Sequence, residues 1–227
     1  IHITISAKHV IAEAQRSLKA ACTAQQTTLH RATQHGAHQM DDLVEHLSQM
    51  LHHLHRDVIR MALQLFYPDF FGGSWPMFAD GMDFHAFQLV DMYNEDNVYS
   101  LKHNWRSVER PGSRDTKGNV IWTMREENYY ELAMGGDLCH GQGQMGIFQA
   151  TYSPCGEDGL PVLSYDPITG EINKEVVKYW EEHYDLSAYV ERNHEWLMPK
   201  IRGKLHVRGG DMDNFYLNLG QILSDSE

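Results

Sequence analysis

The sequence predicts a mixed α/β chain, in which a long αα-hairpin precedes a part with few parallel strands and flanking helices. All seven prolines, and every glycine except Gly36, lie after residue 60. Apolar residues recur at helical spacing up to residue 68. Further on, residues 203–208 look like a strand, and Gly209-Gly210 turns that strand into a last helix near residues 215–223. The length of 227 residues and the 42% of hydrophobic residues suit one globular domain with an appendage.

Two apolar stripes predict two long helices, joined at Gly36, which offers a helix stop. Pro68 must end or break the second helix. We therefore expect a His-rich helical hairpin over residues 1–60 and an α/β domain over residues 61–227. Alternation alone allows a short strand over residues 2–6. The stripes consist of Ile11, Ala14, Leu18, Ala21, Cys22, Gln25 and Leu29, and of Met40, Leu43, Val44, Leu47, Met50, Leu51, Leu54, Val58, Met61 and Leu65.

After Pro68 the pattern predicts shorter elements. Residues 70–75 and 119–123 look like short strands. Asn173 offers a cap for a helix that runs through residue 183. A second helix is expected over residues 186–197. The stretch from about residue 76 to residue 159 has few long periodic runs, and we expect much of it to be irregular.

Charge and composition exclude several classes of protein. The chain carries a formal net charge of −12, so it lacks the basic face that a phosphate-backbone binder needs. No apolar run is long enough for a membrane span, and the first residues lack the pattern of a signal peptide. Three cysteines are too few, and wrongly spaced, for a disulfide framework or a zinc knuckle. We expect a cytoplasmic protein; secretion stays open because the chain does not begin with Met.

Five segments resemble the C-terminal half of bacterial esterases of the α/β-hydrolase superfamily. They are ALQLFYPDFFGGSW (62–75), DGMDFHAFQLVDMYNEDNVY (80–99), WTMREENYYELAMG (122–135), SYDPITGEINKEVVKYWEEHYDL (164–186) and KIRGKLHVRGGDMDNFYLN (200–218). The resemblance covers roughly residues 58–222. It implies a truncated α/β-hydrolase-like remnant, in which Asp213 matches the family's catalytic acid and Asp211 lies beside it.

The chain departs from this family at two catalytic positions. The family's nucleophile lies in a strained Gly-x-Ser-x-Gly-Gly turn. The matching stretch here is His52-His53-Leu54-His55-Arg56-Asp57, which has no serine and no glycine. The family's catalytic histidine would follow the last strand and helix, and the sequence ends at Glu227 without it. Because an acid alone cannot perform acyl transfer, Asp213 is expected to be vestigial and a serine esterase is disfavoured.

A truncated sheet would also leave an apolar strand edge without a partner. The N-terminal hairpin or a second copy of the chain could cover that edge. We therefore expect a homo-oligomer, most simply a two-fold dimer.

Histidine and aspartate form a stripe on the second predicted helix. His38, Asp42, His46 and His53 recur at spacings that place them on one helix face, away from the apolar stripe. Imidazole and carboxylate at this spacing are ligands that zinc uses. His30 and His35, near the bend, are weaker candidate ligands. The alternative is a solvated helix face without metal.

Two functions follow from these observations. One is a hydrolase of small-molecule ester or phosphoester substrates, in which a divalent metal, with zinc as the candidate, activates water at the His/carboxylate stripe. The other is a catalytically inactive, esterase-derived interaction or structural subunit. The missing serine and histidine favour the second function, and the histidine stripe favours the first. Neither requires nucleic acid or a membrane.

Overall fold

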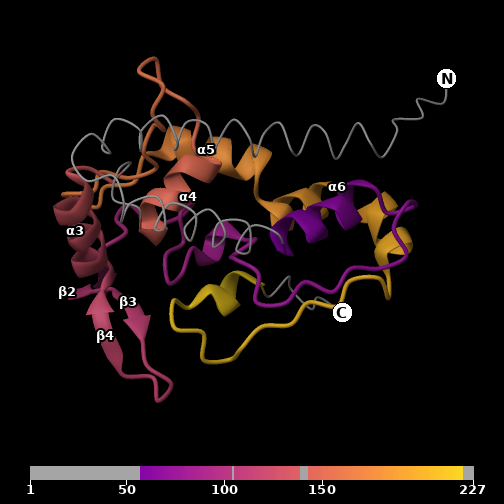
Figure 1. Cartoon of the computed structure of the whole chain (residues 1–227), viewed down its shortest axis with the longest axis horizontal. Helices are drawn as coiled ribbons and strands as arrows, with labels where there is room; N and C mark the ends of the chain where they lie inside the picture. Colours follow the sequence, from indigo (N-terminus) through magenta and orange to yellow (C-terminus); the bar gives the residue numbers. More distant parts are fainter. Residues whose placement is uncertain (1–56, 104, 139–142, 222–227) are drawn as a thin grey trace, which may run out of the picture.

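A computed structural model describes residues 57–103, 105–138 and 143–221 (Figure 1). The expected αα-hairpin lies outside the described residues, apart from the end of its second helix. The elements with defined bounds are η2 (Phe84–Ala86), β1 (Ser100–His103), β2 (Arg106–Glu109), β3 (Pro111–Arg114), β4 (Val120–Thr123), α3 (Met124–Gly135), α4 (Gln144–Tyr152), α5 (Lys174–His183), α6 (Leu186–Ile201) and η3 (Leu217–Gln221).

A helix covers residues 57–66 and ends before Pro68, as the sequence predicted. Met61 and Leu65 of the expected apolar stripe are fully buried, and Val58 packs against the same cluster. This cluster joins the helix to α6 through Leu197 and other apolar residues. We call it the end cluster, because its members come from the two ends of the described chain: Met61, Leu65, Ala79, Met82, Leu186, Leu197 and Ile201.

A larger core lies between η2, α3, α4 and α5 and comes from the middle of the chain. Trp180 on α5 is fully buried at its centre. Its ring lies 5.1 Å from that of Phe84, 5.7 Å from that of Phe87 and 5.6 Å from that of Tyr152, measured between centroids. The contacts with Phe87 and Tyr152 are edge-to-face, and such contacts add to the free energy gained from burying apolar area.

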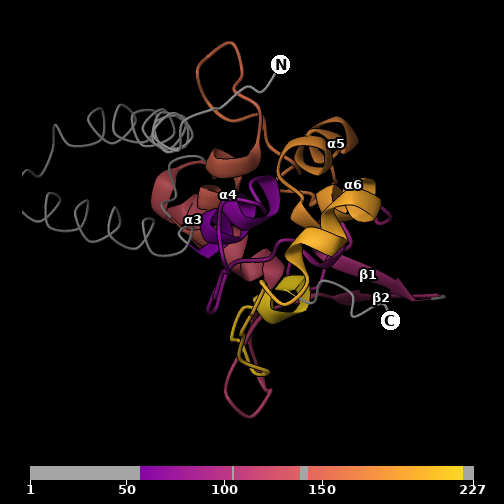
Figure 2. The ribbon, with the colours of Figure 1, turned by 90° about the vertical axis from the view of Figure 1, so that its right-hand side faces the viewer.

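The regular strands form two antiparallel pairs. In one, β1 pairs with β2 from Ser100↔Glu109 to His103↔Arg106, and Figure 2 shows this hairpin projecting from the body. In the other, β3 pairs with β4, and α3 follows β4 directly. The sheet of regular parallel strands expected from the sequence is absent from the described residues. β4 confirms the strand predicted at residues 119–123.

Much of residues 76–159 was expected to be irregular, and this is confirmed for residues 76–99, where η2 is the one element with defined bounds. The rest of the stretch holds β1 to β4, α3 and α4, of which only β4 was expected. The two helices lack a clear apolar stripe: α3 buries the polar residues Glu127, Asn128 and Glu131, and α4 buries residues around most of its circumference. Periodicity detects only helices that have one apolar and one polar face.

Within the described part of the chain, parallel pairing occurs between residues 74–78 and 204–208. Isolated bridges join Ser74 to Leu205 and Met77 to Arg208. The N–H of Ser74 donates to the carbonyl of Lys204 at 2.7 Å, and the N–H of His206 donates to the carbonyl of Ser74 at 3.0 Å. Pro76 has no N–H, so it cannot complete a regular ladder. The strand expected at residues 203–208 is therefore a pair of bridges, and the strand expected at residues 70–75 is reduced to the single bridge at Ser74.

The two predicted C-terminal helices are confirmed. Asn173 caps α5 through the backbone N–H groups of Glu175 and Val176. Asp185 caps α6, which continues past the expected end at residue 197 to Ile201. The last predicted helix is a short 3₁₀ turn, η3. None of the helices in the described part of the chain is both long and apolar enough to cross a membrane.

Candidate functional site

Two aspartates follow the carboxyl ends of the paired segments. Asp80 comes after residues 74–78, and Asp213 comes after residues 204–208. Because the two segments run parallel, their carboxyl ends lie at the same end of the pair. Open α/β sheets place functional groups beyond the carboxyl ends of their strands. The negative charge of Asp213 acts on Asp80, so the two carboxylates lie in each other's field. We call them the strand-end acids.

Asp80 has a strongly perturbed titration. Its side chain is buried, with a residue exposure of 2%. Burial, and then the negative charges of Asp213 and Asp57, raise its pKa to about 7. The same field reaches the buried Tyr152, whose pKa is raised by burial and by Asp80. A carboxyl group of this kind can hold or release a proton near neutral pH.

Asp213 is fixed by the backbone of its own loop. Its Oδ1 accepts the N–H groups of Phe215 and Leu217, both at 3.0 Å. The loop also contains Tyr216 in the left-handed region, at φ 61°. A non-glycine residue in that region costs energy, and it is kept only where the surroundings determine it. The position of the Asp213 carboxylate is therefore set by local geometry.

Arg114, at the end of β3, holds this loop from the other side. Its Nε donates to the carbonyl of Asp213 at 2.8 Å, and its Nη2 donates to the carbonyl of Asp211 at 3.1 Å. The same nitrogen reaches Oδ1 of Asn218 at 3.2 Å. The guanidinium also lies over the ring of Tyr216, 4.3 Å from its centroid. The planar fork of arginine suits such multiple acceptors.

The structure describes only some of the site residues that the sequence predicted. Asp213 lies at the expected strand end, half-buried, and Asp211 is exposed. The metal candidates lie outside the described residues: His30, His35, His38, Asp42, His46 and His53. Sequence reasoning missed Asp80. The available signal was an acid directly after the apolar run Met77-Phe78-Ala79, at the carboxyl end of an extended segment.

Within residues 57–103, 105–138 and 143–221, no three His, Cys, Asp or Glu side chains come together as a metal site. No family model, curated protein or solved structure matches the chain.

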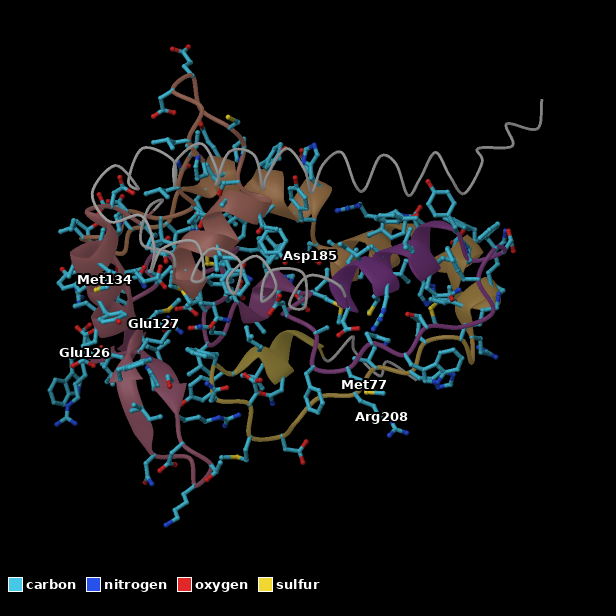
Figure 3. All side chains as sticks on the ribbon, viewed as in Figure 1. Met77, Glu126, Glu127, Met134, Asp185 and Arg208 are labelled. Carbon is cyan, nitrogen blue, oxygen red and sulfur yellow. The ribbon has the colours of Figure 1, made fainter. Side chains whose placement is uncertain are left out.

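A second pair of buried carboxyl groups, Glu127 and Glu131, lies one turn apart on α3. The oxygens of Glu131 accept the N–H groups of Met145 and Gly146, each at 2.9 Å. Gly143 gives α4 no side-chain cap, so Glu131 satisfies the first N–H groups of that helix. Glu127 (labelled in Figure 3) has its Oε2 buried without a hydrogen-bond partner. Its pKa is raised to about 8 by burial and by the charge of Glu131. We assign this pair a structural role.

Proposed function

We propose that the protein is a hydrolase of small-molecule ester or phosphoester substrates, and that the strand-end acids handle the protons of the reaction. The observation that carries this proposal is the placement of Asp80 and Asp213 at one edge of the parallel pair, with the pKa of Asp80 near neutrality. The resemblance of residues 58–222 to bacterial esterases, in which Asp213 matches the acid, supports the same reaction class.

In this mechanism the two carboxyl groups have different tasks. Below about pH 7 the buried Asp80 carries a proton, which it donates to the leaving oxygen as the ester bond breaks. Asp213, held by two backbone N–H groups, accepts the proton of the attacking water. A divalent metal, when bound by His38, Asp42, His46 and His53 with His30 and His35 as further ligands, would supply an activated water. Both proton transfers in this mechanism are carried out by Asp80 and Asp213.

Kinetics of single substitutions test these roles. We expect Asp80→Asn to lower kcat for an aryl ester or aryl phosphate about a hundredfold and to remove the loss of activity above pH 7. Asp213→Asn should lower kcat by a similar factor. Asp211→Asn is the matched control, because this side chain is exposed in the same loop; it should stay within about twofold of wild type.

Metal analysis tests the water-activating part separately. We expect near-stoichiometric zinc, manganese or iron on untagged protein, and loss of both metal and turnover in His46→Ala. Turnover that survives a chelator and His46→Ala would remove the metal from the proposal and leave the aspartates. Turnover that does not depend on Asp80 and Asp213 would refute the proposal.

The second candidate is an inactive, esterase-derived interaction or structural subunit. One observation favours it: among the described residues, the hydrogen bonds of the Asp213 carboxylate come from backbone N–H groups, and no serine or histidine side chain bonds it. In that case no ester or phosphoester would be turned over by protein purified through two unrelated columns. We also propose a homo-oligomer, most simply a two-fold dimer. A monomeric mass by light scattering at micromolar concentration would contradict it.

A further inference from the structure

The parallel pair has two faces of opposite character. Along residues 74–77, Ser74 and Pro76 are buried while Trp75 and Met77 are exposed. Along residues 205–208, Leu205 and Val207 pack against the end cluster while His206 and Arg208 are exposed. The outer face therefore carries four exposed side chains, Trp75, Met77, His206 and Arg208. We call it the outer strand face, and Figure 3 labels Met77 and Arg208 on it.

The outer strand face carries a stacked ring pair and one exposed cation, Arg208, and two further cations, Arg202 and Lys204, lie just before it in the chain. The rings of Trp75 and His206 stack with centroids 5.0 Å apart and planes 11° apart. Arg202 and Arg208 are exposed, and in the described part of the chain no carboxylate forms an ion pair with either. Lys204 donates to the carbonyl of Pro68. These cations lie on a chain whose net charge is −12, so they form a local exception to its overall charge.

The backbone beside this face is an open strand edge. The carbonyl of Lys204, the N–H of His206 and both backbone groups of Arg208 bond residues 74–78. The N–H of Lys204 instead donates to the carbonyl of Ile201 at 2.8 Å. Leu205 and Val207 direct their backbone groups away from residues 74–78, because successive residues of an extended chain alternate. Within the described residues, the N–H groups of Leu205 and Val207 have no backbone acceptor. An edge of this kind is a template for another strand.

We propose that the edge at Leu205 and Val207 binds an extended peptide of a partner protein in which acidic and apolar residues alternate. Added as a strand, the peptide would place its acidic side chains beside His206 and Arg208 and its apolar side chains beside Leu205 and Val207. Charge complementarity selects this occupant. A second copy of this edge would bring Arg208 close to the basic residues of the other copy. Like charges opposite each other destabilise a strand pair.

A fluorescence anisotropy titration of the full chain tests this binding. The probe is a short labelled peptide of alternating valine and glutamate, and its control has lysine in place of glutamate. We expect micromolar affinity for the glutamate peptide, weakening with salt, and at least tenfold weaker binding of the lysine peptide. Arg208→Glu should lower affinity at least tenfold. Arg106→Glu, a charge reversal at an exposed arginine of β2, should leave it unchanged.

Backbone methylation of the peptide tests strand addition independently of the protein's folding. One peptide is N-methylated on its valines and another on its glutamates. Only one of the two sets of N–H groups faces the protein in a strand pair, so one methylated peptide should bind and the other should not. Equal binding of both peptides would overturn the proposal. Equal binding of the glutamate and lysine peptides would also overturn it. So would displacement of the bound peptide by single-stranded oligothymidylate, or a dimer of the chain that prevents the peptide from binding.

Discussion

The replacement Glu127→Gln should change how the protein's stability depends on pH. Glu127 has an ordinary pKa of 4.5 when unfolded and a pKa of about 8 when folded. Between these values the folded state keeps a proton that the unfolded state releases, so the free energy of unfolding falls as pH rises. At 1.36 kcal/mol per pH unit, the rise from pH 5 to pH 8 removes about 4 kcal/mol. The effect reaches its limit above pH 8.

Urea unfolding at pH 5 and pH 9 measures this effect. Glutamine has the shape of the protonated acid and does not titrate, so Glu127→Gln should lose about 4 kcal/mol less between the two pH values than wild type. Any cost of burying the amide is the same at both pH values and cancels. Glu126→Gln is the matched control: Glu126 is exposed on the same helix, and its pKa is lowered by the Thr123 cap. An unchanged pH dependence in Glu127→Gln would refute the reasoning.

Two further predictions concern polar contacts that join distant segments. Arg114→Ala should raise the rate of amide hydrogen exchange in residues 211–218 at least tenfold, because three side-chain hydrogen bonds and a ring contact are lost. Arg114→Lys should raise the exchange rate nearly as much, because lysine lacks the planar guanidinium group. Asp185→Ala should lower the free energy of unfolding by about 3 kcal/mol by urea titration, because Asp185 caps α6 and accepts the hydroxyl of Tyr93 at 2.5 Å. A cost in Asp185→Asn as large as that in Asp185→Ala would contradict the capping role, because asparagine also caps helices.

Local signals in the sequence predicted the elements that local chemistry determines. Asn173 marks the start of α5, and Pro68 marks the end of the helix over residues 57–66. The same reasoning missed α3, because its buried face includes the polar side chains of Asn128 and Glu131. Their burial depends on partners far along the chain. The hydroxyl of Tyr165 donates to Asn128, and the N–H of Met145 in the first turn of α4 donates to Glu131. Hydrophobic periodicity carries no information about such partners.

Only part of the candidate site could likewise be predicted from the sequence. Asp213 was predicted from the resemblance of residues 58–222 to bacterial esterases, in which it matches the catalytic acid. Asp80 was missed because its distinctive property, a pKa near 7, arises from burial and from the charges of Asp213 and Asp57. Both causes are properties of the folded arrangement. The histidine stripe stays a prediction, since its residues lie outside the described part of the chain.

The end cluster has a consequence for how the chain assembles. Its members come from residues 61–82 and 186–201, while the larger core comes from residues 84–180 and from Leu217. The loop at residues 157–159 is exposed and projects from the body (Figure 1). A chain cut there would leave two pieces that each hold half of the end cluster and one segment of the parallel pair. Neither half could bury its apolar residues alone, so the two pieces should recover their structure only by binding each other, as a split protein does.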